Sequence, residues 1–174
     1  MIKTKIFTVI LVLLLISCEK ERQDLSMDKI PYTGDELRID GYYYSNLTLA
    51  DDIGVAVFYR DGFCINTWVK PINQDTLSYI ENNILFNDEF INKIKSIPTH
   101  IGVFKINAKS IEFETWEAGR DIITFSHYGE ILNDTTFLIT KQVNNDSGKS
   151  YSEKLTYKFR QFSPKPDSTN TFIN

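Results

Sequence analysis

The sequence is poor in several residue types, and each shortage narrows what the protein can be. Its two histidines, His100 and His127, lie 27 positions apart with no cysteine or histidine at metal-ligand spacing, so we expect no metal site and no cofactor. Lysine and arginine total 19 against 23 acidic residues, which gives a formal net charge of -4. This balance excludes a generic basic nucleic-acid binder, and no nucleic-acid partner is expected.

Motifs of common enzymes are also missing. There is no Gly-x-Ser-x-Gly elbow, no phosphate-binding Gly-Lys-Ser/Thr loop and no dinucleotide fingerprint. Glu112 and Glu114 share one face of a predicted strand, but alternate carboxylates are typical of a solvated strand face. We therefore expect no catalytic residues and a protein that is not an enzyme, with a hydrolase assembled from scattered residues as the third hypothesis.

What the chain does have is enough apolar material for one core. Of its 174 residues, 42% are hydrophobic, and they include 12 Phe and 9 Tyr, more aromatic side chains than a disordered chain carries. A chain of this length wraps a single core without splitting. The composition therefore predicts one globular domain.

The N-terminus carries an export pattern. Two lysines precede an apolar stretch at residues 6–16, whose 11 residues fit the hydrophobic region of a secretory signal and are too few to span a bilayer. The sequence Leu-Ile-Ser-Cys at residues 15–18 resembles the bacterial lipobox, in which the cysteine is acylated and the peptide before it removed. The resemblance implies a lipoprotein signal peptide at 1–17 and lipidation of Cys18. The alternatives are a plain signal peptide with an incidental cysteine, or a short hydrophobic helix.

The residues after this cysteine are charged and lack an apolar pattern. We expect a solvated polar tether over residues 18–34, followed by one domain over 35–174. In lipoproteins of enteric type an aspartate directly after the cysteine marks inner-membrane retention; because Glu19 stands there, the resemblance implies the outer membrane of a Gram-negative cell envelope. Cys64 is then left without a disulfide partner, and we interpret it as a small packed residue in a strand.

The body of the chain shows the two-residue alternation and turn residues of β-hairpins. Asp-Gly at 61–62 separates two apolar runs, Asn-Asp at 133–134 separates two others, and Gly129 indicates a bulge in a long strand. At 111–115, Ile, Phe and Thr alternate with glutamates, which predicts one face inside and one mostly wet. The strand patterns cover residues 37–44, 53–59, 63–68, 101–106, 110–116, 121–132, 135–142 and 152–162.

Residues 75–96 are the exception, because their apolar residues recur at helical spacing. Ser78 and Glu81 fit a capping box, and Asp88 is placed to restart a helix. We predict one broken helix or two short ones, which would close one end of a barrel or cover an open sheet edge.

Together these elements predict an all-β protein, an antiparallel up-and-down barrel or half-open barrel of about eight strands with a helical insertion between strands 3 and 4. The pattern resembles the lipocalin-like (calycin) fold, although Asp-Gly-Tyr-Tyr at residues 40–43 replaces the Gly-x-Trp signature of lipocalins. Segments 129–137 and 159–169 resemble uncharacterised bacterial lipoproteins. These resemblances imply a fold and an envelope location, without an activity.

Aromatic residues on different predicted strands are the candidate ligand-binding group. They lie where they would line one end of a barrel; the alternative is that they belong to the core. An eight-stranded barrel is just wide enough to be filled by side chains or to hold one small molecule. The candidate residues are Tyr42, Tyr44, Trp68, Trp116 and Tyr128.

Two functions therefore compete. The first is a lipid-anchored envelope lipoprotein that binds a small apolar or amphipathic ligand in its barrel. The second is a protein–protein interaction module of the cell envelope whose barrel is packed and ligand-free. In both, the partner of the N-terminus is the membrane, reached through the lipid anchor.

Overall fold

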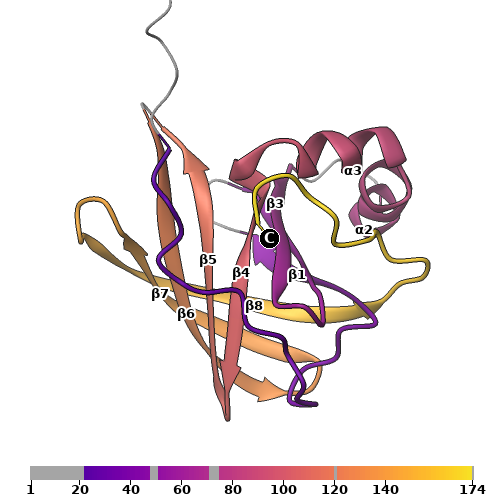
Figure 1. Ribbon diagram of the computed structural model, residues 1–174. Helices are drawn as coiled ribbons and strands as arrows, with labels where there is room; N and C mark the ends of the chain where they lie inside the picture. The colour runs from indigo at the N-terminus through magenta and orange to yellow at the C-terminus, as the bar shows by residue number, and fades with distance from the viewer. Residues whose placement is uncertain (1–21, 48–50, 71–74, 120, 174) are drawn as a thin grey trace, which may run out of the picture.

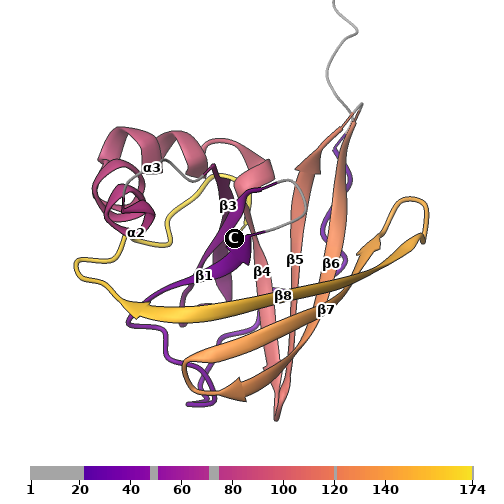
Figure 2. The same cartoon turned by 180° about the vertical axis from the view of Figure 1, so that it is seen from behind.

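The structure is a computed structural model that describes residues 22–47, 51–70, 75–119 and 121–173. Eight antiparallel strands follow one another in chain order and close into a barrel, because β8 pairs back with β1 (Figures 1 and 2). This confirms the predicted all-β barrel, and its architecture is compatible with a lipocalin-like fold. The strands are β1 (Gly41–Leu47), β2 (Ile53–Phe58), β3 (Phe63–Val69), β4 (Ile101–Asn107), β5 (Ser110–Ala118), β6 (Ile122–Asn133), β7 (Thr136–Asn144) and β8 (Ser150–Gln161).

Turn chemistry explains the hairpins. Gly62, between β2 and β3, has φ +86°, and a Cβ there would lie 2.3 Å from the backbone oxygen of Ile30, so only glycine fits this turn. Between β6 and β7, Asn133 accepts hydrogen bonds from both the backbone nitrogen and the hydroxyl of Thr135. The register of β6 against β7 shifts between Tyr128 and Gly129, which confirms the predicted bulge.

Four short helical elements lie between β3 and β4, which confirms the predicted insertion: α2 (Thr76–Ile80), η1 (Glu81–Leu85), α3 (Asp88–Lys95) and η2 (Pro98–His100). One detail of the prediction is wrong. The first helix is capped by Asp75, whose carboxylate accepts from Ser78 N, and not by a capping box starting at Ser78. Asn87 caps α3 in the same way through Phe90 N.

The insertion neither closes an end of the barrel nor covers a sheet edge. A closed barrel leaves no edge to cover, and the apolar helix faces pack instead on the outward side of β1–β3 (Figure 1). We call this layer the outer core. It comprises Tyr42, Val55, Val57, Tyr59, Phe63, Ile65, Val69, Ile80, Ile84, Leu85, Ile91, Ile94, Ile101, Trp116 and Phe162. Among the helices in the described ranges, none combines the length and apolar composition needed to cross a membrane.

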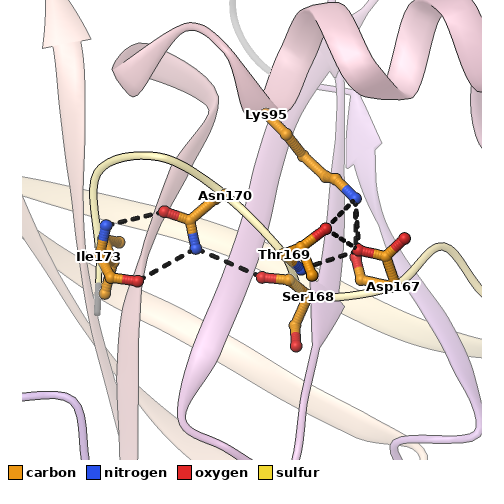
Figure 3. A network of polar contacts seen from close by, with 6 residues as sticks. All are labelled: Lys95, Asp167, Ser168, Thr169, Asn170 and Ile173. Carbon is orange, nitrogen blue, oxygen red and sulfur yellow. Dashed lines mark hydrogen bonds and ion pairs between the residues drawn. The ribbon is translucent and has the colours of Figure 1, made fainter.

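The segment after β8 contacts the helical insertion. The buried ammonium of Lys95 in α3 lies 2.7 Å from the Asp167 carboxylate, which also accepts from the backbone nitrogen and hydroxyl of Thr169 (Figure 3). Further along, the Asn170 side chain accepts from Ile173 N at 2.7 Å and donates to Ile173 O. The ion pair joins this segment to α3, and the Asn170 bonds order the segment itself.

The segment before β1 differs from the expected tether. From Arg22 onward it lies along the outside of β5 and β6 and then reaches the far end of the barrel (Figure 1). The Trp116 indole donates to Gln23 O at 2.5 Å, and the carboxylate of Glu114 is wholly buried beneath this segment. The outward face of β5, expected to be mostly wet, is therefore covered here. Residues 18–21 lie outside the described residues.

Candidate functional site

The barrel interior has two chemically different halves. At the end that carries the β2–β3 and β4–β5 turns, aromatic rings fill the interior; Phe58 and Phe104 have ring centroids 4.7 Å apart, and Phe137 stacks on Tyr157 at 4.7 Å. Tyr32, from the segment before β1, packs against Phe104 and covers this end. We call this the aromatic half. Its burial of rings supplies much of the hydrophobic stabilisation, roughly 1.5–3 kcal/mol for each Phe.

Toward the opposite end, the inward-facing positions become polar. On β5, Ile111 and Phe113 belong to the interior core, so alternation places Thr115 and Glu117 on the same inward face. On β3, Cys64 belongs to the interior core, so alternation places the Asn66 and Trp68 side chains on the inward face as well. We call this the polar half. Its described side chains are Asn66, Trp68, Thr115, Glu117, His127, Gln142, Glu153 and the Tyr157 hydroxyl end.

His127 lies at the boundary between the two halves. Its ring stacks on Phe113 at 4.5 Å, and its Nε2 lies 3.4 Å from the Thr115 hydroxyl and 4.0 Å from Oε1 of Glu117. Burial lowers the pKa of His127 to about 3, because it removes the water that would solvate an imidazolium. The ring is therefore neutral at physiological pH.

Glu117 and Glu153 are the acidic groups of the polar half. Glu117 accepts from the Gln142 amide at 2.9 Å, and 37% of its side chain remains exposed. Burial, and secondarily the charge of Glu153, raises the pKa of Glu117 to about 7. Burial also raises the pKa of Glu153, whose Oε2 is buried without a hydrogen-bond partner. The two acids thus share a region that disfavours holding both charges.

A second buried acceptor lacks a partner in this half. Asn66 is only 6% exposed, and its Oδ1 makes no hydrogen bond within the part of the chain that the structure describes. Leaving a buried acceptor unpaired costs about 1–3 kcal/mol. Unpaired acceptors on an inward face, at an end where Trp68 is 39% exposed, are what a site for a hydrogen-bond-donating ligand requires.

The five aromatic residues expected to gather at one barrel end do not do so. Tyr42 and Tyr44 lie on the outward side of β1, with their ring centroids 6.3 Å apart, and Trp116 faces outward on β5. Tyr128 also faces outward, with the Lys141 ammonium 4.2 Å from its ring. Of the five, Trp68 alone faces inward, over Gly54, where a Cβ would lie 3.0 Å from its ring and 2.4 Å from the Tyr157 hydroxyl.

The reason is that β1 to β3 are apolar on both faces. The helical insertion buries the outward side as completely as the barrel buries the inward side, so alternation does not reveal which face holds the interior. Ligand contact by these aromatics stays a prediction. Cys18 lies outside the described residues, so its lipidation stays a prediction too.

Sequence reasoning missed Glu117, Glu153, Asn66 and Gln142. A signal for Glu117 was present, because the alternation of Ile, Phe and Thr at 111–115 continues inward for one more step. Glu153 carries a similar signal, because it stands one step before Leu155 and Tyr157 in the alternation of β8. Asn66 and Gln142 come from other strands and carry no such signal. Cys64 is buried in the interior core, where burial raises its thiol pKa, in keeping with the expected packing role.

Other places in the fold are less suited to a ligand. Glu112 forms an ion pair with Lys105 at 2.8 Å, and Glu114 is held by the segment before β1, so the two carboxylates serve separate contacts. A depression of about 200 Å³ lies between Tyr32, Gly34 and Lys105 at the aromatic end. That is below the roughly 300–1,000 Å³ of typical ligand sites. The described residues contain no cluster of metal-ligating side chains.

Comparisons with protein-family models, with curated proteins and with solved structures found no match.

Proposed function

We propose that this protein is a lipid-anchored, non-enzymatic binding protein of the cell envelope that holds a small amphipathic molecule in its barrel. The observation that carries the proposal is the division of the interior. The aromatic half is filled, while the polar half presents Asn66 Oδ1 and Glu153 Oε2 as buried acceptors without partners. A ligand with a polar head would satisfy these atoms and place its apolar part toward the aromatic rings.

The position of Arg22, the first described residue, supports lipid anchoring. Arg22 bridges to Ile122, and Ile122 pairs with Ala118, the residue after Glu117, so Arg22 lies at the polar end of the barrel. Cys18 precedes Arg22 by four positions. Four extended residues span at most about 14 Å, so lipid on Cys18 would hold the polar end within that distance of the headgroups. Two or more acyl chains make such anchoring permanent. Glu19, which stands where an aspartate would mark inner-membrane retention, supports the outer membrane as the place of the anchor.

The two tryptophans give a direct test of ligand binding. With 5-fluorotryptophan in the chain, held in lipid nanodiscs, Trp68 reports on the polar half, and Trp116, beneath Gln23, is an internal control. Titration with 2-phenylethylamine, 2-phenylethanol and 3-phenylpropanoate should shift the Trp68 signal saturably for at least one of them, while Trp116 stays in place. If none of the three moves Trp68, the proposed ligand site is refuted.

Lipid anchoring has its own test. Cys18→Ala should release the protein from the membrane fraction, because the variant lacks the sulfur that carries the acyl chains. The control is Cys64→Ala, which removes the buried interior thiol and should leave the protein in the membrane fraction. A Cys18→Ala chain that still sediments with membranes as the unaltered chain does would refute the anchor.

A second candidate function is docking to an envelope protein. The observation that favours it is on the helical insertion, where the aromatic side chains of Phe86 and Phe90 are 49% and 37% exposed. Crosslinking in intact cells should then recover one recurrent partner, and Phe86→Ser with Phe90→Ser should abolish that product. Recovery of the same product from the double variant would exclude this surface.

A further inference from the structure

The polar half contains two acids and two unpaired buried acceptors, and no lysine or arginine of the described strands points into it. Asn66 Oδ1 and Glu153 Oε2 are buried and unpaired, and Glu117 has one amide donor, from Gln142. Within the strands that the structure describes, lysine and arginine side chains occupy outward positions only. These residues are Lys105, Lys141, Lys154, Lys158 and Arg160.

The remaining basic groups near this end do not neutralise the acids. His127 is uncharged, for the reason given above. Lys149, in the turn before β8, lies over the Tyr151 ring at 5.1 Å, and no ion pair joins it to Glu117 or Glu153 in the described ranges. Arg22, whose guanidinium lies 5.3 Å from the Trp116 ring centroid, and Lys70, which follows β3, are also at this end, and among the described residues no ion pair joins either to Glu117 or Glu153. The region is therefore negative whenever either glutamate ionises.

Aromatic surface lies beside these acids. The Trp68 indole is partly exposed at the polar end, and the Tyr157 hydroxyl lies near it across Gly54. Rings next to carboxylates favour cations, because the ring faces and the carboxylates are both electronegative. A neutral or anionic polar head gains less here, since a carboxylate accepts but does not donate.

Building on the proposed function, we infer that the ligand carries a protonated amine, which Glu117 and Glu153 bind while Asn66 Oδ1 accepts one of its hydrogens. The apolar part of the ligand then faces the Trp68 indole and the aromatic half. An alkylammonium group has three donors, and the inward face of this half offers three acceptor side chains, those of Asn66, Glu117 and Glu153.

This pairing makes binding depend on pH in a definite direction. Glu117 titrates near neutrality, so ionisation between about pH 6 and pH 8 creates the counter-charge, and affinity for an amine should rise over that interval. The other titratable groups that face Glu117 are Glu153 on β8 and His127 on β6; His127 stays neutral throughout. Bound cation should in turn lower the pKa of Glu117, so binding near pH 7 releases a proton.

The experiment uses the same fluorotryptophan chain in nanodiscs and the same three probes, which share one phenyl group and differ in headgroup charge. At about pH 8, 2-phenylethylamine should bind at least about tenfold more tightly than 2-phenylethanol or 3-phenylpropanoate. Glu117→Gln with Glu153→Gln should remove that preference, because both counter-charges for the amine are lost. The matched control is Glu112→Gln, on the outward face of β5, which should behave as the unaltered chain does.

Each outcome decides between the two claims. If 2-phenylethanol or 3-phenylpropanoate binds as tightly as the amine, the amine assignment is overturned while the ligand site stands. If no probe shifts Trp68, the proposed function itself falls. If the double variant fails to fold, the pH series on the unaltered chain decides, because amine affinity that stays level or falls between about pH 6 and pH 8 contradicts a glutamate counter-charge.

Discussion

The carboxylate of Glu114 should be worth more to stability than any other acid on the outer surface of the barrel. It is completely buried without a cation, and it accepts from Ser26 N, Ser26 Oγ, Met27 N at 2.7 Å and the Asn145 amide at 2.9 Å. Hydrogen bonds to a charged group each contribute about 1.5–3 kcal/mol. The contributions do not add fully in Glu114→Ala, because the released Ser26 and Met27 donors can reach water.

We therefore expect Glu114→Ala to lower the free energy of unfolding by about 2–4 kcal/mol. For a domain of this size that corresponds to a fall in Tm of roughly 5–15 °C. Urea unfolding followed by circular dichroism measures the first quantity. The control is Glu112→Ala on the same strand face, which breaks only a partly exposed ion pair with Lys105 and should cost about 1 kcal/mol or less.

Hydrogen exchange gives an independent check. In the unaltered chain the amides of Ser26 and Met27 should be protected, and Glu114→Ala should remove that protection while leaving the β5–β6 ladder protected. The reasoning is refuted if Glu114→Ala costs no more than Glu112→Ala, or if both amides exchange at the rate of an unstructured peptide in the unaltered chain.

Three further outcomes are expected. Phe58→Ala should lower the free energy of unfolding by about 3–5 kcal/mol in urea titrations, because Phe58 is buried among four aromatic rings. His127 has a pKa of about 3 in the folded protein, against an ordinary 6.5, so on acidification the unfolded chain takes up this proton first. The free energy of unfolding should therefore fall as the pH drops from about 6.5 toward 3, and His127→Gln should make that fall smaller. Asp167→Asn should destabilise by about 1–3 kcal/mol more than Lys95→Met, since only the former leaves a buried ammonium without its counter-charge. Limited proteolysis of the C-terminal residues and urea midpoints compare the two variants.

The strand and turn chemistry made the barrel predictable from the sequence. Asp-Gly at 61–62 and the bulge at Gly129 mark backbone requirements that act locally, so they hold whatever surrounds them. The helical spacing at 75–96 is equally local. What the spacing did not specify is the surface that the helices cover, because that depends on the outward residues of three distant strands.

The candidate site was less predictable, for a physical reason. Tyr42 and Tyr43 are adjacent and both buried, one outward under the helices and one inward among the rings, so no alternation distinguishes them. Glu117 and Glu153 come together only through the closure of the barrel. The unpaired Oε2 of Glu153 is likewise a property of the folded barrel, which a sequence does not display.

The attachment of residues 22–27 along β5 and β6 also bears on mechanics. Were the chain pulled through a lipid at Cys18, the load would enter at Gln23, bonded to Ile122 O and Thr124 N, and would act on Glu114 and Trp116 together. Because the hydrogen bonds of residues 23–27 to β5 and β6 would be loaded together, each would bear only part of the force. Such a load would therefore reach the barrel at its polar end, where Arg22 lies.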